Sequence, residues 1–234
     1  MKKKLRLAYY IFFLLPYIYE IDLWIPITII IISELSNQKK NIRKLIRIIR
    51  GRNLFQGNDL LFKQTLLEVD LYGEYGVGES TLWVFNNTKA KIMAVDTSKK
   101  WISTVKSKIG PSKKITIEWI DLGDLGAWGK PISYKKREFI YNYLESIWLK
   151  KEKPQLVLID GRFRVACFLF SIIAGSPGTK IIFDDYINRP HYHVVEEFIK
   201  PTEICGRQAL FVIPDNIDEE NIQKNITKFL YVMD

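Results

Sequence analysis

The chain has 234 residues, of which 47% are hydrophobic, 13% aromatic and 26% charged. This composition excludes a globally disordered chain, and the length suits about one domain with a well-filled core. The formal net charge of +9 suits acidic partners in general, among them nucleic acid, anionic lipid and phosphorylated metabolites, and it does not choose among them.

The first 52 residues are predicted to form an apolar arm that associates with a membrane. Apolar residues from Leu7 to Ile32 are interrupted by two prolines and by the acidic pair Glu20 and Asp22. Each apolar half is shorter than the roughly 20 residues of a spanning helix, and basic residues flank both ends. A re-entrant or interfacial hairpin fits this pattern best. The alternative is an arm that docks on the domain or on another subunit.

The end of the arm, Asn37 to Arg52, interleaves lysines and arginines with isoleucines and leucines at roughly helical spacing. Such a helix either packs one face on its own domain or rests on anionic lipid. The two cysteines, Cys167 and Cys205, have no metal-ligand or redox spacing and argue for a reducing compartment. We therefore expect a cytoplasmic protein that is membrane-associated through residues 5–52.

From residue 53 onward, short apolar runs alternate with amphipathic stretches, which predicts one α/β domain over residues 53–234. The expected strands are Leu71 to Tyr75, Ala90 to Asp96, Lys114 to Asp124, Gln155 to Gly161, Thr179 to Tyr186, Gln208 to Pro214 and Lys228 to Asp234. The expected helices are Ser80 to Asn87, Lys99 to Ile109, Arg137 to Pro154, Arg164 to Gly175 and Tyr192 to Ile199. Strand followed by helix, repeated in this way, implies crossover connections and a parallel sheet covered on both faces. The predicted fold class is therefore α/β, with a doubly wound, mostly parallel sheet and an N-terminal apolar appendage.

Polar residues follow the ends of the first five expected strands. In a doubly wound sheet, ligands bind beyond the carboxyl ends of the strands, so these residues are the candidates for a site. They are Glu74, Gly76 and Gly78 after the first strand, Asp96 after the second, Asp121 and Asp124 after the third, Asp160 after the fourth, and Asp184 and Asp185 after the fifth.

The glycine loop after the first strand, within YGEYGVGEST, favours a nucleoside ligand with a positive charge. Gly76 and Gly78 let backbone N–H groups approach a ligand, and Asp96, 18 positions after Gly78, suits the hydroxyls of a ribose. Glu74 and Glu79 place negative charge where the pyrophosphate of a dinucleotide would lie, which disfavours a nicotinamide cofactor. A ligand that combines a ribose with a sulfonium centre is S-adenosylmethionine.

The stretch EYGVGEST resembles the first motif of class I S-adenosylmethionine-dependent methyltransferases, AVD ending in Asp96 looks like their ribose-binding motif, and IDLGD with Asp121 is similar to the position that faces the adenine. The resemblance covers residues 66 to 185. It implies a Rossmann-like fold and S-adenosylmethionine as the cofactor. The cofactor-binding residues that it implies are Glu74, Gly76, Gly78, Ser80, Asp96 and Asp121. The usual third glycine is absent, which leaves the conformation of the loop open. A structural turn without a ligand is the alternative for the two glycines.

A second cluster concerns the chemistry of transfer. Asp160 and the pair Asp184 and Asp185 follow adjacent expected strands, so three carboxylates can converge on one cation, and hard oxygen ligands suit Mg²⁺ or Ca²⁺. FDDY resembles the strand end of metal-dependent sugar and small-molecule O-methyltransferases, which implies metal roles for these three residues. The alternative is structural ion pairing, in which Asp184 pairs with Arg162, Arg164 or Arg189.

Two further segments border the expected site. His191 is the candidate base that takes the acceptor proton, together with Asp160 as a second catalytic candidate, although a histidine that caps or packs the helix start fits the same position. The stretch from Asp121 to Phe139 is long for a connection, and Trp128 within it either stacks on a ring of a ligand or packs in the core.

Together these features predict a methyltransferase that methylates an oxygen of a glycan, a glycolipid precursor or a small molecule at the membrane surface. The alternative is a membrane-associated Rossmann-like binding or scaffold protein without turnover, which the missing third glycine favours. Nucleic acid stays open as an acceptor, although much of the excess basic charge lies beside the apolar arm, where lipid explains it equally well. The oligomeric state stays open.

Overall fold

The structure is a computed structural model that describes residues 54–55 and 58–233. The arm predicted over residues 1–52 and the boundary predicted at residue 53 lie outside the described residues. Within the described part of the chain, no helix is both long enough and apolar enough to cross a bilayer.

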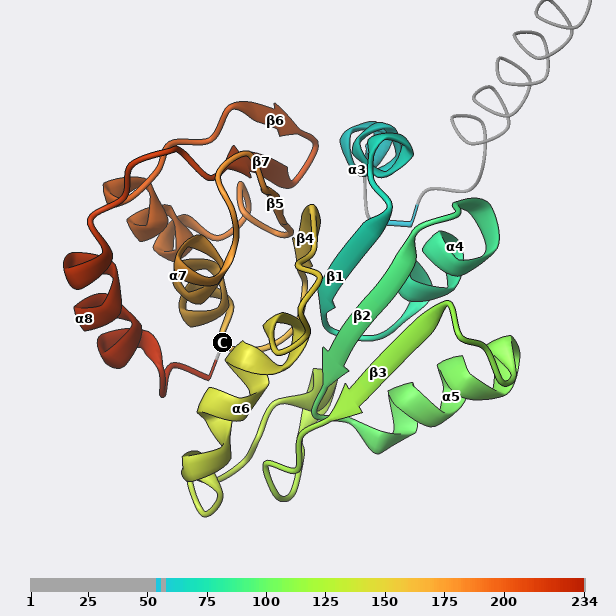
Figure 1. Cartoon of the computed structure of the whole chain (residues 1–234). Helices are drawn as coiled ribbons and strands as arrows, with labels where there is room; N and C mark the ends of the chain where they lie inside the picture. Colours follow the sequence, from blue (N-terminus) through green and yellow to red (C-terminus); the bar gives the residue numbers. More distant parts are fainter. Residues whose placement is uncertain (1–53, 56–57, 234) are drawn as a thin grey trace, which may run out of the picture. The chain divides into compact units, whose positions relative to one another are not determined.

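Seven strands form one sheet in the order β3-β2-β1-β4-β5-β7-β6 (Figure 1). The strands are β1 (Leu71–Tyr75), β2 (Lys91–Asp96), β3 (Ile115–Trp119), β4 (Leu156–Ile159), β5 (Lys180–Phe183), β6 (Glu203–Cys205) and β7 (Gln208–Val212). β1 to β5 run parallel, whereas β7 is antiparallel to both β5 and β6. The predicted fold class, a doubly wound and mostly parallel sheet, is therefore confirmed.

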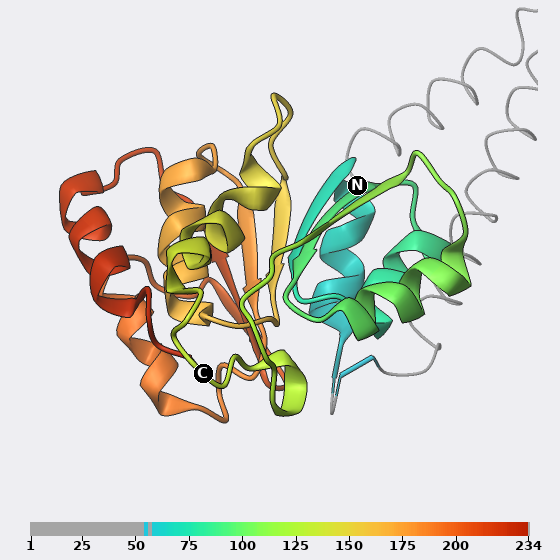
Figure 2. The same ribbon diagram turned by 90° about the horizontal axis from the view of Figure 1, so that it is seen from below.

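Helices cover both faces of the sheet, as the view from below shows (Figure 2). The α-helices are α3 (Leu60–Thr65), α4 (Glu79–Asn87), α5 (Lys99–Ile109), α6 (Ile140–Glu145), α7 (Arg164–Ala174) and α8 (Glu219–Phe229). Short 3₁₀ helices span Leu66–Glu68, Ala127–Gly129, Arg137–Phe139, Ser146–Trp148 and Pro190–Glu197. α3, α4 and α5 lie on one face, and α6, α7 and α8 lie on the other.

The sheet is buried on both faces because its central strands are apolar at successive positions. In β2, Ile92 and Ala94 pack in the core on the α4 side, whereas Met93 and Val95 pack in the core on the α7 side. This continuous apolar run is the pattern of a strand in a parallel sheet with helices on both faces. It leaves polar side chains to gather where the strands end.

Three expectations for the C-terminal half are wrong in detail. Lys228 to Asp234 was expected as a strand, but the segment begins in the last turn of α8, whose Ile222 and Ile226 face the core one turn apart. Asp218 caps this helix by accepting the N–H of Asn221 at 3.1 Å. The expected helix over residues 192–199 is a 3₁₀ helix that starts at Pro190. The short strand β6 was not expected.

The predicted helix from residue 137 to 154 is also shorter than expected. Its helical part ends at Trp148, where the Lys153 ammonium donates to the Trp148 carbonyl oxygen and so takes up an acceptor at the helix end. Trp148 is buried, whereas Leu149 is exposed. The helix therefore ends where its apolar contacts with the core end.

The loop after β1 and the loop after β4 approach each other more closely than side chains would allow. Gly76 has φ +99°, and a Cβ built on it would lie 3.0 Å from both N and Cα of Gly161. A Cβ on Gly161 would lie 2.9 Å from the Gly76 nitrogen. Each glycine is therefore required by the backbone of the other. This contact is sufficient to explain the absence of a side chain at Gly76.

We predict that Gly76→Ala destabilises the fold by about 2–5 kcal/mol, because alanine is strained at a positive φ and its methyl group meets backbone that cannot give way. Gly78→Ala is the matched control, since Gly78 has an extended backbone and nothing lies within 4 Å of a Cβ built there. The control should change stability by less than about 1 kcal/mol. Urea unfolding of the full chain measures both, and equal effects of the two substitutions would contradict the assignment.

Candidate functional site

The glycine loop and Asp96 form one structure at the carboxyl edge of the sheet. One oxygen of the Asp96 carboxylate accepts the N–H of Val77 at 2.7 Å, and the other accepts the N–H of Ser98 at 2.6 Å. Gly76 itself donates to the Val95 carbonyl oxygen at 2.9 Å. The loop that follows β1 is thus fastened to the end of β2, as a shared cofactor site requires.

The Asp96 carboxylate keeps acceptor capacity for a ligand. The two carboxylate oxygens have about four lone-pair sites between them, so the bonds from the backbone N–H groups of Ser98, Val77 and Thr97 leave at least one free for a hydroxyl. Burial raises the pKa of Asp96, and the bonds from the backbone of Ser98 and Val77 oppose that shift. The backbone bonds fix the orientation of the carboxylate before any ligand arrives.

Gly78 presents bare backbone to open space. It is the residue before the first turn of α4, its φ is −172°, and no atom lies within 4 Å of a Cβ built on it. Its N–H is held by the Thr81 hydroxyl at 3.0 Å. The space at Gly78 is therefore available to a ligand, in contrast to the space at Gly76.

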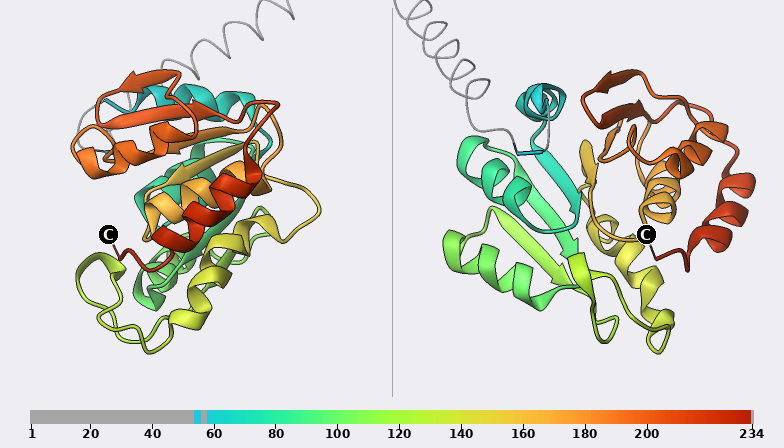
Figure 3. Two further views of the ribbon diagram at one scale, coloured as in Figure 1. Left: turned by 90° about the vertical axis from the view of Figure 1, so that its left-hand side faces the viewer. Right: turned by 180° about the vertical axis from the view of Figure 1, so that it is seen from behind.

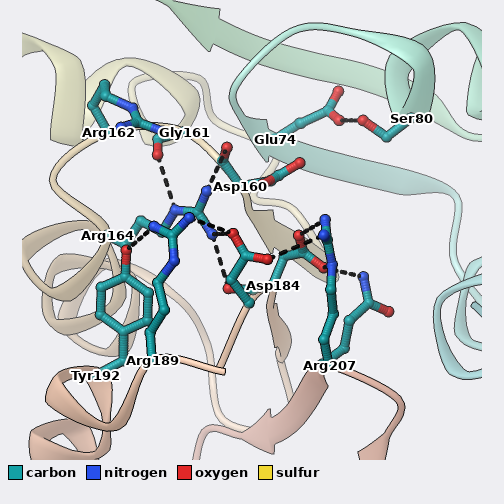
Figure 4. Close-up of polar contacts among 12 residues, drawn as sticks. Glu74, Ser80, Asp160, Gly161, Arg162, Arg164, Asp184, Arg189, Tyr192 and Arg207 are labelled. Atoms are coloured by element: carbon teal, nitrogen blue, oxygen red, sulfur yellow. Dashed lines mark hydrogen bonds and ion pairs between the residues drawn. The ribbon is translucent and has the colours of Figure 1, made fainter. Parts of the chain in front are cut away.

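Glu74 lies beneath this loop and not in it. Its side chain is fully buried and accepts hydrogen bonds from the hydroxyls of Ser80 and Thr81, the latter at 2.6 Å. Burial raises its pKa to about 8, and the two hydroxyl bonds oppose the shift. Glu74 and Ser80, both predicted to contact the cofactor, bind each other and hold the start of α4 against β1 (Figure 4).

Asp121 lies near the start of the long loop that joins β3 to α6. It pairs with Lys136 at 2.5 Å and accepts the N–H of Gly123 at 3.0 Å. The bond from Lys136 lowers the pKa of Asp121. Further along the loop, the Gly129 carbonyl oxygen accepts the hydroxyl of Thr97 at 2.8 Å, so the loop is tied to the residue next to Asp96.

Asp160, Asp184 and Asp185 converge as expected. β4 and β5 are neighbours, and one oxygen from each carboxylate lies within 4.8 Å of the others. Arginines surround this cluster, as Figure 4 shows. Arg207 binds both oxygens of the fully buried Asp184, and it reaches Asp185 at 3.1 Å.

A second arginine ties the cluster to α7. The buried Arg164 binds an Asp160 oxygen at 3.0 Å and an Asp185 oxygen at 3.3 Å, and it also donates to the Asp184 carbonyl oxygen at 2.8 Å. Arg189 binds Asp185 at 2.9 Å. Three guanidinium groups therefore face three carboxylates.

This arrangement does not fit a divalent cation. Mg²⁺ and Ca²⁺ are held by carboxylate and other oxygens, and here the oxygens of Asp184 and Asp185 are engaged by guanidinium groups. A dication at this point would also lie beside the positive charges of Arg164 and Arg207. The contacts favour the ion-pair alternative, with Arg207, which sequence reasoning did not propose, as the principal partner of Asp184.

Asp160 differs from its two neighbours because its side chain is partly exposed and contacts one arginine. Burial and the nearby Asp184 raise the pKa of Asp160 to about 7, while Arg164 and Arg207 oppose the shift. A carboxyl with a pKa near neutrality can accept a proton from a substrate and release it again.

The two histidines play different parts. His191 is exposed, and its ring lies against Tyr192 with ring centroids 4.3 Å apart. The Nε2 atom of His193 lies 3.1 Å from the Tyr186 carbonyl oxygen. His191 is thus open to solvent, whereas His193 helps to hold the 3₁₀ helix that contains both.

Three residues of the site were missed by sequence reasoning. Thr81, the third residue after Gly78, fastens the glycine loop. Thr97, the residue after Asp96, fastens the long loop. A search for hydroxyl residues beside the motifs would have found both. Arg207 lies far from its partner Asp184 in the chain, and no local pattern marks it.

Comparison with solved structures reveals the same architecture elsewhere. A methyltransferase-like protein from Silicibacter pomeroyi superposes with a TM-score of 0.68 and 26% identity, over 78% of this chain and 98% of that chain. The described domain has the fold of class I S-adenosylmethionine-dependent methyltransferases.

More distant matches to this class I methyltransferase fold have TM-scores below 0.5. The N-methyltransferase NodS from Bradyrhizobium japonicum, in complex with S-adenosylhomocysteine, has 12% identity, a TM-score of 0.44 and coverage of 74% of this chain and 97% of that chain. An RNA methyltransferase from Salinibacter ruber, in complex with the same compound, has 13% identity, a TM-score of 0.43 and coverage of 68% and 90%. No protein-family model and no curated protein matches the sequence.

We predict that the stability of the protein falls as the pH rises from about 4.5 to 8, in part because of Glu74. In this window the unfolded chain releases the Glu74 proton while the folded protein, with a pKa of about 8, keeps it. Glu74→Gln removes this contribution, so the variant should gain stability relative to the native protein between pH 5 and pH 8, by a few kcal/mol at most.

Urea unfolding of both proteins at several pH values measures this difference. Glu68→Gln, at an exposed partner of Lys180, is the control and should give a difference that hardly changes with pH. If the difference between Glu74→Gln and the native protein is also constant with pH, Glu74 is charged in the folded state and the assignment is wrong.

Proposed function

We propose that the described domain is an S-adenosylmethionine-dependent methyltransferase. The observation that carries the proposal is the bond between the Asp96 carboxylate and the Val77 N–H, which unites the glycine loop and the acidic end of β2 at one edge of the sheet. The open backbone at Gly78 supplies the space beside them. The fold shared with the Silicibacter pomeroyi protein supports the same conclusion.

Each part of the edge has a use in holding the cofactor. Asp96 would accept the ribose hydroxyls, the backbone at Gly78 would lie against the amino-acid part, and Asp121 with the long loop would border the adenine. Glu74, Ser80 and Thr81 position the loop from beneath. When bound, S-adenosylmethionine supplies an electrophilic methyl group.

Oxygen methylation requires a group that takes the acceptor proton. Asp160 is our candidate, because it is partly exposed at the end of β4 and its pKa is about 7. Arg164 holds the carboxyl in place at 3.0 Å and itself stays buried. His191 is the second candidate, since it is exposed on the segment after β5.

The acceptor class follows from the sequence of the arm. An apolar segment with a basic amphipathic end suits a protein that works at a cytoplasmic membrane face, which favours a glycan, a glycolipid precursor or a small molecule presented there. The net charge of +9 is compatible with anionic acceptors.

A binding protein without turnover is the second candidate function. It is favoured by the ion pairs, because Asp184 and Asp185 are engaged by arginines and only Asp160 has a partly free carboxyl. Both candidates bind the cofactor. They differ in one result, which is whether the product S-adenosylhomocysteine accumulates in the presence of an acceptor.

We predict that Gly78→Leu weakens the binding of S-adenosylhomocysteine at least tenfold while the fold is kept. The side chain would enter the space reserved for the ligand, and it meets no protein atom within 4 Å of its Cβ. At the position before the first turn of α4, the substitution should lower the free energy of unfolding by no more than about 1 kcal/mol. Isothermal titration calorimetry measures the affinity, and thermal unfolding verifies the fold.

Leu67→Ala, at an exposed residue before β1, is the control and should bind as the native protein does. If Gly78→Leu binds as tightly as the native protein, the cofactor does not lie at this loop. If the native protein itself does not bind S-adenosylhomocysteine or S-adenosylmethionine, the proposed function is wrong.

A further inference from the structure

The long loop between β3 and α6 extends beyond the sheet edge that carries the site (Figure 3), and it exposes large apolar side chains. Trp128 is 79% exposed, Ile132 66% and Tyr134 51%. Core packing of Trp128, one of the two expectations from the sequence, is therefore wrong. The loop is closed on itself by a bridge between Leu125 and Pro131 and by the bond from the Ile132 N–H to the Asp124 carbonyl oxygen at 3.0 Å, so Trp128 and Ile132 project from an ordered structure.

The C-terminal segment extends the same surface. The Tyr134 hydroxyl donates to the Tyr231 carbonyl oxygen at 3.0 Å, and the two rings meet edge to face with centroids 6.4 Å apart. Tyr231 and Val232 are themselves exposed. A shallow cleft of about 720 Å³ lies between the two segments. Aromatic and aliphatic groups from two separate parts of the chain thus form one surface, which we call the loop surface.

Basic side chains accompany the loop surface. Lys130, Lys135 and Arg137 are exposed, and none of them makes an ion pair with a described residue. Lys136 is different, because it pairs with Asp121. Exposed acids are also present, at Asp124 and Glu138, on either side of the basic group. Between them, residues 125–137 carry basic side chains and no acidic one.

The backbone of the loop is held in an unusual conformation that keeps Trp128 outward. Trp128 has φ +59°, which is costly for a residue other than glycine and persists only where the surroundings impose it. The next residue, Gly129, is fastened to Thr97 at 2.8 Å. The loop surface is thereby connected to the residue that follows Asp96.

We propose that the loop surface docks on an anionic lipid bilayer. Tryptophan and tyrosine favour the headgroup region, an isoleucine beside them supplies apolar area, and unpaired lysine and arginine are attracted to anionic headgroups. The loop surface therefore combines exposed aromatic and aliphatic groups with unpaired basic groups, which is the combination that an anionic bilayer interface attracts. The proposal depends only on described residues and is separate from the arm predicted over residues 1–52.

Docking in this way turns the carboxyl edge of the sheet toward the bilayer. Because Thr97 ties the loop to the end of β2, the cofactor edge and the lipid contact would move as one unit. An acceptor anchored in the membrane would then reach the site without leaving the membrane. The inference goes beyond the proposed function, since lipid docking does not require that the domain transfer a methyl group.

The experiment uses an environment-sensitive fluorophore on single cysteines in the full chain. In a Cys205→Ser background, with Cys167 buried, the fluorophore is attached at Ile132→Cys or at the control Leu149→Cys. Leu149 is 69% exposed, similar to Ile132, but it precedes β4 and so lies at the opposite edge of the sheet. Vesicles of phosphatidylcholine with 30% phosphatidylserine, at roughly the anionic content of a cytoplasmic leaflet, are compared with pure phosphatidylcholine.

We expect blue-shifted emission at position 132 with the anionic vesicles, and little change at position 149 or with neutral vesicles. Replacing Lys130, Lys135 and Arg137 by glutamine should raise the lipid concentration required for the shift at least tenfold, since each basic residue near an anionic surface strengthens binding by about fivefold. Unchanged emission at position 132 while the protein cosediments with vesicles would overturn the proposal. A shift that appears without vesicles and grows with protein concentration would also overturn it, because the loop surface would then bind a second copy.

Discussion

The close approach of Gly76 and Gly161 is the constraint on which the site depends. It brings the loops after β1 and β4 into contact through backbone alone, with 3.0 Å between a Cβ at Gly76 and the Gly161 main chain. The Gly76 N–H meanwhile reaches the end of β2. One residue therefore sets the relative positions of three strand ends. The parallel pairing of β1 with β2 and β4 brings Gly78, Asp96 and Asp160 to one edge of the sheet, and this contact fixes how closely the loops after β1 and β4 approach each other there.

Buried charge is handled differently on the two sides of that contact. On the side of α4, burial keeps Glu74 protonated near neutral pH, and hydroxyl groups satisfy it. On the side of α7, arginines neutralise Asp184 and Asp185. Removing either partner of such a buried pair is costly, whereas the intact pair contributes little net stability. These ion pairs are best understood as fixing the geometry of two loops, and among the three carboxyls they leave that of Asp160 the most exposed.

The part of the fold built from local patterns could be predicted from the sequence. β1 and α5 have the predicted bounds, because their apolar spacing and their flanking turn residues agree with the tertiary structure. The strand expected over residues 228–234 is wrong because the segment begins in the last turn of an amphipathic helix, which ends at Phe229, and then continues as a turn, with Tyr231 and Val232 exposed. A short window at the end of a helix resembles a strand.

In the candidate site, too, features marked by local sequence patterns could be predicted, and long-range contacts could not. Asp96 and the glycine loop were recognisable because their spacing along the chain is short and their chemistry is distinctive. The contact of Gly76 with Gly161 was not predicted, since Gly161 lies 85 positions further along the chain and nothing local marks the contact. The pairing of Arg207 with Asp184 was missed for the same reason. Spacing in the sequence indicates candidate ligand-binding residues, whereas contacts between residues distant in the chain decide which residues hold those candidates in place.

The most direct test asks whether the cofactor binds at the edge organised by Gly76 and Asp96. In this test, S-adenosylhomocysteine is titrated into ¹⁵N-labelled protein while the amide chemical shifts are measured. The competing location is a surface groove of about 520 Å³ beside α4, which is lined in part by Asn86 and Asn87. We predict saturable shifts for the amides of Val77, Gly78 and Ser98, with those of Asn86 and Asn87 unchanged. Shifts confined to the groove, or binding that leaves the Val77 amide unmoved, would contradict the proposed site.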